Sequence, residues 1–191
     1  MKAIVTVLFI GLVSLAYGQI PKGTWRLGPE VDFASSKTEI DGIDLEIVSS
    51  DLEIGVGLGY YIIDNLEIGV NLGILSSKDE VDNFESKSSG IAVGPALEYK
   101  IALSDRFYLP IGGGMRFNSI TSEDDDTEEV TFTGMSYGLF TGLEFVESNK
   151  LSAWISIGPE FGSLSDDDTD SEFDLNTFGI GMGFSFYFGN N

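Results

Sequence analysis

Charged residues that could carry out chemistry are scattered along the chain and form no compact motif. Glu98 and Glu160 are carboxylic acids of the type that share acid–base catalysis, yet no spacing singles them out as a pair. The sequence contains no His and no Cys. A Ser nucleophile would therefore lack its usual base, and thiol catalysis and disulfides are excluded. We expect a protein that is not an enzyme and that holds no cofactor.

Two acidic runs raise the separate question of a metal site. They comprise Glu123–Asp126 with Glu128-Glu129, and Asp166–Asp168 with Asp170 and Glu172. Several carboxylate oxygens could bind a hard cation such as Ca²⁺, but neither run has the Gly and terminal Glu of an EF-hand loop. We interpret both runs as solvated segments without a dedicated metal site. Divalent cations bound at these runs are a secondary hypothesis.

The charge balance narrows the possible partners. The chain of 191 residues has 10 Lys and Arg against 31 Asp and Glu, a formal net charge of -21. Phosphates would be repelled, so nucleic acid is not an expected partner. A hydrophobic content of 42% argues against a disordered acidic chain. The length fits one domain.

The last stretch, Thr177–Phe188, shows how the charges would be positioned. Its large residues share one parity: Phe178, Ile180, Met182, Phe184, Phe186 and Phe188. The opposite parity is mainly Gly, with Thr177, Ser185 and Tyr187. Such alternation predicts a β-strand with one apolar face. Since about 9–11 tilted residues cross the hydrocarbon of a bilayer, this strand is long enough to span a membrane.

The same alternation recurs along the chain. It covers residues 24–33, 51–62, 66–74, 91–101, 107–117, 134–145 and 151–161. Short turns are predicted at Asp64-Asn65, Ser104-Asp105 and Glu147–Lys150, and long acidic loops at Ala34–Ser50, Ser76–Ser89, Ser119–Glu129 and Ser163–Asp174. Strict alternation of short and long connections is typical of bacterial outer-membrane barrels. We predict an all-β fold, an eight-stranded antiparallel up-and-down transmembrane β-barrel.

Two soluble folds also contain alternating strands. A secreted β-sandwich has strands of about 5–6 residues, shorter than these segments, and polar solvent faces. A lipocalin-like barrel would turn its apolar parity inward around a ligand. Its outer surface would then consist mainly of glycines, and nothing in such a fold requires a Gly-rich exterior.

Four prolines, Pro29, Pro95, Pro110 and Pro159, lie inside predicted strands. Because Pro cannot donate to a strand ladder, we expect local kinks there without a change of parity.

The N-terminus predicts export. Met1-Lys2 is followed by the apolar run Ala3–Ala16 and by small residues around Gly18, the pattern of a signal peptide. We expect residues 1–18 to be cleaved and residues 19–191 to form the barrel domain. An even strand number would place both termini on the periplasmic side of the outer membrane of a Gram-negative bacterium, and the acidic loops outside the cell.

The inward parity would carry charges into the lumen. It supplies Arg26, Lys100 and Arg116 against Glu30, Glu53, Glu67, Glu98, Glu144 and Glu160, with Tyr61, Tyr108, Trp154 and Tyr187. An eight-stranded lumen is just wide enough to be filled by side chains, and buried charges must be paired. We therefore single out Arg26, Glu30, Glu98, Lys100, Arg116, Glu144 and Glu160 as candidates for lumen ion pairs. The alternative is a narrow ion or water path gated by Arg116 or Arg26.

With these residues in view, the chain resembles the small outer-membrane β-barrel proteins of the OmpA/OmpX-like type. The resemblance covers Thr24–Phe188 and includes the aromatic end Phe184-Ser185-Phe186-Tyr187-Phe188, which is similar to the signal read by the barrel assembly machinery. It implies a monomer in contact with outer-membrane lipid and lipopolysaccharide. We expect a structural or surface-interaction role with the acidic loops as contact surface. The alternative is a narrow pore or a conduit for small hydrophobic compounds.

Overall fold

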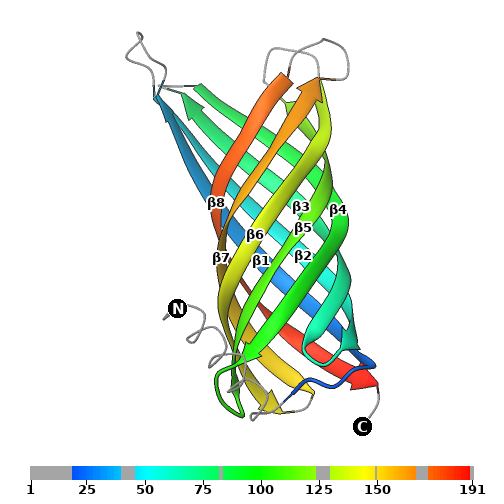
Figure 1. Cartoon of the computed structure of the whole chain (residues 1–191). Coiled ribbons are helices and arrows are strands. Elements are labelled where there is room, and N and C mark those ends of the chain that lie inside the picture. Colours follow the sequence, from blue (N-terminus) through cyan, green and yellow to red (C-terminus); the bar gives the residue numbers. More distant parts are fainter. Residues whose placement is uncertain are drawn as a thin grey trace, which may run out of the picture.

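The computed structural model describes residues 19–39, 46–81, 84–123, 130–148, 150–166 and 172–189. They form eight strands: β1 (Thr24–Glu39), β2 (Glu46–Ile63), β3 (Leu66–Val81), β4 (Phe84–Ala102), β5 (Phe107–Glu123), β6 (Val130–Ser148), β7 (Leu151–Asp166) and β8 (Glu172–Gly189). Each strand pairs antiparallel with the next, and β8 pairs with β1 to close the barrel (Figure 1). The predicted up-and-down barrel is therefore confirmed.

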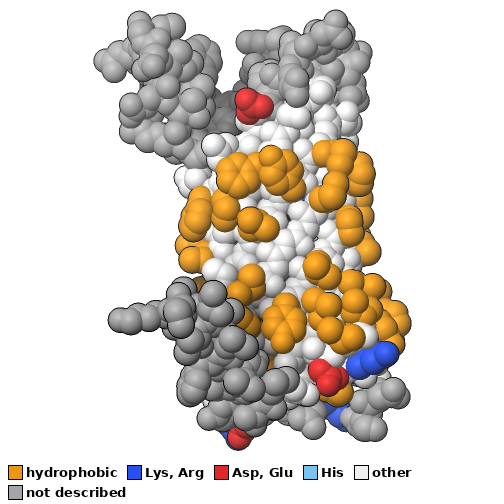
Figure 2. All heavy atoms as spheres, viewed as in Figure 1, with side chains coloured by type: hydrophobic (Ala, Val, Ile, Leu, Met, Phe, Trp, Pro, Cys, Tyr) orange, Lys and Arg blue, Asp and Glu red, His pale blue; other side chains and the backbone are white. Residues whose placement is uncertain are grey.

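The two parities of each strand face opposite environments, as predicted. Outward side chains such as Ile74 and Leu139 are 67% and 65% exposed, whereas inward Tyr61 and Glu67 are 0% and 2% exposed. Figure 2 shows hydrophobic side chains over the middle of the visible wall, with the charged side chains of that face near its two ends. The outside of the barrel thus presents an apolar surface to lipid.

Aromatic residues mark the two borders of this apolar surface. The lower girdle, near the short turns, contains Trp25, Tyr60, Tyr99, Phe107, Phe145, Phe186 and Phe188; the upper girdle contains Phe33, Phe117, Tyr137, Phe161 and Phe178. Rings pack across neighbouring strands within each girdle, with centroids 4.8 Å apart for Trp25 and Tyr60 and 6.0 Å apart for Tyr137 and Phe161. Phe117 follows Phe107 by about ten residues, which on a strand tilted about 45° spans roughly 23 Å. This height matches the apolar band of about 25 Å in outer-membrane barrels.

The strands continue beyond the upper girdle through much of what we predicted to be loops. The β1–β2 ladder extends to the pair Glu39 and Glu46, and the β3–β4 ladder to Val81 and Phe84. We call these paired segments the hairpin extensions, residues 34–39, 46–51, 75–81, 84–90, 118–123, 130–136, 162–166 and 172–177. The loop prediction is wrong for those residues of the hairpin extensions that lie within Ala34–Ser50, Ser76–Ser89, Ser119–Glu129 and Ser163–Asp174. Outside the hydrocarbon, neither face of a strand needs apolar side chains. Such a strand shows no hydrophobic alternation, so its sequence pattern does not predict it.

The remaining connections differ in how far they can be compared with prediction. Asp64-Asn65 forms the predicted two-residue turn, with Asn65 in the left-handed region at φ 63°. Most of both acidic runs, residues 124–129 and 167–171, lies outside the described residues, as do the predicted signal peptide and residues 40–45, 82–83, 149 and 190–191. None of the described residues forms a helix long and apolar enough to cross a membrane.

The prolines interrupt single ladders without shifting the register. Pairing of β4 with β5 stops after Val93 and resumes at Ala96 with the same offset, so Gly94 and Pro95 are skipped. On its other side Pro95 keeps its β3 partner. The unchanged offset places Pro95 opposite Met115, whose carbonyl oxygen would overlap a Cβ at Gly94. A glycine before the proline therefore leaves room for a carbonyl that the proline nitrogen cannot bond.

The other in-strand prolines follow this rule in part. Pro29 and Pro159 also lie in gaps of one ladder, against β8 and β6 respectively, and each is preceded by a glycine. Pro110 lies in a gap of the β5–β6 ladder but follows Leu109. The recurring Gly-Pro pairs are thus explained by ladder gaps, with the parity unchanged as predicted.

Candidate functional site

A buried ionic network crosses the lower lumen. Lys100 on β4 places its Nζ atom 2.5 Å from Glu144 on β6 and 2.9 Å from the Tyr187 hydroxyl on β8. The Tyr187 and Ser152 hydroxyls also donate hydrogen bonds to the Glu144 carboxylate. Glu98 lies 3.2 Å from Lys100, without the alignment of a hydrogen bond. The side chains of Lys100 and Glu144 are 2% and 1% exposed, so four strands meet in a closed polar layer.

A second pair joins β1 to β3 across a glycine on β2. The Arg26 Nε atom lies 2.8 and 2.9 Å from the two carboxylate oxygens of Glu67. In the ladders Arg26 lies beside Gly59, and the Glu67 side chain folds over this glycine. A Cβ at Gly59 would overlap the Glu67 carboxylate. The Gly-rich inward parity therefore provides the volume in which the long charged side chains lie.

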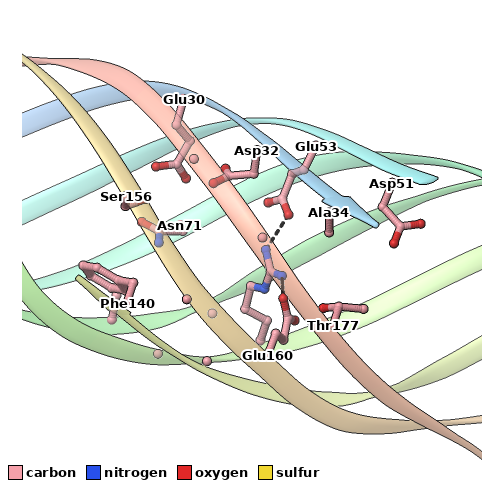
Figure 3. A pocket seen from close by; sticks show the side chains of 18 of the residues that line it. Glu30, Asp32, Ala34, Asp51, Glu53, Asn71, Phe140, Ser156, Glu160 and Thr177 are labelled. Atoms are coloured by element: carbon pink, nitrogen blue, oxygen red, sulfur yellow. Dashed lines mark hydrogen bonds and ion pairs between the residues drawn. The ribbon is translucent and has the colours of Figure 1, made fainter. Parts of the chain in front are cut away.

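Arg116 bridges two acids higher in the lumen. Its guanidinium donates hydrogen bonds to Glu53 on β2 and to Glu160 on β7, on opposite sides of the barrel (Figure 3). Arg116 is 26% and Glu160 24% exposed, because this bridge borders an open cavity. Next to Arg116 on the inward face of β5, Asn118 donates a hydrogen bond of 2.9 Å to Ser136.

The short-turn end of the lumen is sealed by a cluster that we call the tyrosine plug. It consists of Ile20, Tyr61, Ala102, Tyr108 and Tyr187, all of which are buried. These rings and side chains lie below the Lys100 layer, so the two together close the barrel at this end.

The segment before β1 supplies the last member of the plug. The backbone nitrogen of Ile20 donates to the side chain of Asn65 at 2.8 Å, and the Asn65 nitrogen donates back to the Ile20 carbonyl at 3.0 Å. Lys22 and Gly23 add backbone hydrogen bonds to Asp64 and Tyr61. The β2–β3 turn thus holds Ile20 in the short-turn end of the barrel.

Above the ionic layers the lumen opens into a cavity of about 690 Å³. Its lining includes Arg26 and Lys100 near the ionic layers and Leu75, Ile120 and Leu164 in the hairpin extensions. Figure 3 shows Glu30, Asp32 and Phe140 projecting into it. The cavity is therefore a pocket that is closed at the short-turn end.

Among the described residues, six of the seven candidate lumen residues form ion pairs and Glu30 forms none. The pairs are Arg26–Glu67, Lys100–Glu98, Lys100–Glu144, Arg116–Glu53 and Arg116–Glu160. The sequence predicts Glu53 and Glu67 on the inward parity but does not single them out as candidates. Parity alone could not rank them, because the choice of partner depends on the stagger between strands.

The arrangement offers little for acid–base catalysis or metal binding. Glu98 and Glu160 bind different cations, Lys100 and Arg116, in separate layers. Among the described residues, no group of three or more acidic side chains is arranged to hold a metal ion. The geometry provides a closed base with a pocket above it.

Comparisons with known proteins agree with this architecture. The sequence profile of a family described as "Outer membrane protein beta-barrel domain" matches residues 4–190. No sequence of a curated protein matches the chain.

Several solved structures share the fold. The outer membrane protein OprG from Pseudomonas aeruginosa aligns with a TM-score of 0.63 at 10% identity, over 89% of this chain and 98% of that chain. Neisserial surface protein A aligns with a TM-score of 0.59 at 11% identity, over 91% and 99%. The N-terminal β-barrel domain of Pseudomonas aeruginosa OprF aligns with a TM-score of 0.58 at 14% identity, over 87% and 98%.

Proposed function

The chain belongs to the outer membrane protein β-barrel domain family, and from this premise we propose a structural or surface-interaction role with a lumen closed to through-flow. The barrel would act through its outer end and its lipid-facing wall, without catalysis. The single observation that carries this proposal is the closure of the short-turn end.

That closure has two successive parts. The Lys100–Glu144 pair is almost completely buried, and the tyrosine plug lies beneath it with Tyr61 at 0% exposure. An ion would have to displace both an ionic layer and a packed cluster to pass. The predicted alternative, a narrow pore or conduit, needs an open path through this end of the barrel.

We further propose that the short turns face the periplasm and the hairpin extensions face outward. Short periplasmic turns are the rule in bacterial outer-membrane barrels. The acidic runs 124–129 and 167–171 follow the hairpin extensions of β5 and β7, and they would form the contact surface. Lipopolysaccharide is the nearest partner at that surface, with divalent cations as bridges.

Ion flux measurements test the closed lumen. Wild type and Arg116→Ala are reconstituted in vesicles loaded with K⁺, and folded protein is quantified by gel migration without heating. We expect no K⁺ efflux above that of empty vesicles for either protein, because Arg116 lies above the closure. Steady efflux that changes with Arg116→Ala would refute the closed lumen and favour transport.

Protease treatment of whole cells tests the orientation. We expect cleavage within residues 124–129 or 167–171 and protection of an epitope placed after Gly189. Protection of both acidic runs with loss of the epitope would reverse the orientation and remove the proposed contact surface.

A further inference from the structure

Two lumen acids lack the partners that the other lumen acids have. Arg26, Lys100 and Arg116 are engaged by five glutamates. Glu30 and Asp32 lie next to these pairs on the inward face of β1, and neither has an ion pair or a hydrogen bond with any described side chain. The lumen therefore holds two carboxyl groups that no described side chain pairs with directly.

Both acids project into the cavity over glycines. A Cβ at Gly55 would lie 3.2 Å from the Glu30 carboxylate, and a Cβ at Gly181 would overlap the Asp32 carboxylate. Because these glycines carry no side chains, both carboxylates lie at the cavity wall (Figure 3). The cavity volume of about 690 Å³ is in the range of small-molecule pockets.

An aromatic ring lies across a glycine from Glu30. In the ladders Glu30 lies beside Gly183 of β8, and Gly183 lies beside Trp154 of β7. The Trp154 ring covers Gly183, since a Cβ there would lie 2.8 Å from the ring. The Trp154 Nε1 atom is buried and has no hydrogen-bond partner among the described residues. An indole face beside carboxylates is a favourable setting for an organic cation.

The mouth of the cavity is apolar on its inner side. The hairpin extensions turn Leu75, Ile120, Phe132, Leu164 and Leu175 inward, and we call these five residues the collar. Ile120 and Leu164 each lie four residues beyond Arg116 and Glu160 toward the open end. Inward apolar side chains are unexpected where a barrel wall stands in water, since they gain nothing from lipid.

We propose that the cavity binds a small organic cation that carries an apolar group. The cationic group lies near Glu30 and Asp32 beside Trp154, and the apolar group lies within the collar. Charge complementarity selects a cation, and the collar selects against a fully polar one. The closed base makes the site a binding pocket with one entrance, which goes beyond a structural or surface role and remains compatible with a silent lumen.

Binding of hexyltrimethylammonium to the full mature chain in maltoside micelles tests this site. In a Trp25→Phe background Trp154 is the remaining tryptophan, so its fluorescence reports the lumen. Calorimetry on wild type measures affinity independently. We expect saturable binding, and at least ten-fold weaker binding for Glu30→Gln/Asp32→Asn. The matched control is Asp105→Asn/Glu147→Gln, which removes two exposed acids at the short-turn rim and should leave the affinity unchanged.

Wild-type comparisons keep the test independent of folding of the variants. Hexanol and hexyl sulfate carry the same chain with no charge or a negative charge, and tetramethylammonium lacks the chain. We expect each to bind at least ten-fold more weakly than hexyltrimethylammonium. Equal binding of hexanol, or equal binding by a folded Glu30→Gln/Asp32→Asn variant, would overturn the cation site. Equal binding of tetramethylammonium would overturn the role of the collar, and no saturable binding would overturn the proposal as a whole.

Discussion

Replacing Lys100 by Met tests whether a buried ionic network holds the lower lumen together. The two charged atoms of Lys100 and Glu144 lie 2.5 Å apart, and at an effective dielectric constant of about 20 their gross attraction is roughly 7 kcal/mol. The Met side chain also removes the desolvation cost of the ammonium, so the net loss is smaller. Removing one partner of a buried pair typically costs about 3–5 kcal/mol, because the other charge is left uncompensated. We expect Lys100→Met to lower the free energy of unfolding by this amount.

Urea unfolding in phospholipid vesicles measures the effect, with tryptophan fluorescence and gel migration without heating as two probes of the folded barrel. The control is Lys150→Met, which removes an exposed lysine at the β6–β7 turn and should change stability by less than about 0.5 kcal/mol. Adding Glu144→Gln to Lys100→Met should recover at least about 1 kcal/mol. The Gln oxygen can still accept hydrogen bonds from Ser152 and Tyr187.

A loss no larger than that of Lys150→Met would refute the reasoning, since it would mean that water solvates the Lys100 layer. An additive double variant would refute the pairing of Lys100 with Glu144 even if the single change were costly. Either result would also remove the ionic layer, which is one of the two parts of the proposed closure.

Two further substitutions test the wall of the barrel. Val70→Arg places a charge on the lipid face between the girdles and should lower the free energy of unfolding by about 2–4 kcal/mol. Its control, Ile63→Arg, lies beside the short turn and should lower it by about 0–1 kcal/mol. Equal losses for the two variants in vesicle unfolding would contradict the assigned apolar band. Gly59→Ala should cost about 1–3 kcal/mol by overpacking, because its Cβ would overlap the Glu67 carboxylate. Gly179→Ala is the control, since its nearest contact would be an ordinary 3.4 Å, and a loss of stability as large as that of Gly59→Ala would argue against crowding by Glu67.

The sequence predicts which face of each strand looks inward but not which inward residues meet. Parity is visible because large apolar residues such as Phe184 and Phe186 alternate with Gly183 and Ser185. The pairing of Arg26 with Glu67 depends on the stagger of three strands, and no local pattern encodes it.

The hairpin extensions could not be predicted from the sequence for a related reason. Ser35 and Ser50 pair in the β1–β2 ladder, yet serines on both faces of a strand in water look like a loop. The sequence also does not predict which ladder each proline interrupts, because this depends on which neighbouring strand faces the proline nitrogen. Hydrophobic alternation therefore locates the membrane-embedded part of each strand and is silent beyond it.

The hairpin extensions set how far the acidic runs stand from the bilayer. A strand of about 18 residues tilted about 45° rises roughly 42 Å, and the lower girdle lies at its start. About 15 Å of wall therefore stands clear of the hydrocarbon on one side. At physiological ionic strength electrostatic forces decay over about 8 Å. The hairpin extensions thus place Glu123 and Asp166, where the two acidic runs begin, more than one screening length from the hydrocarbon, so these carboxylates add little repulsion within the apolar band.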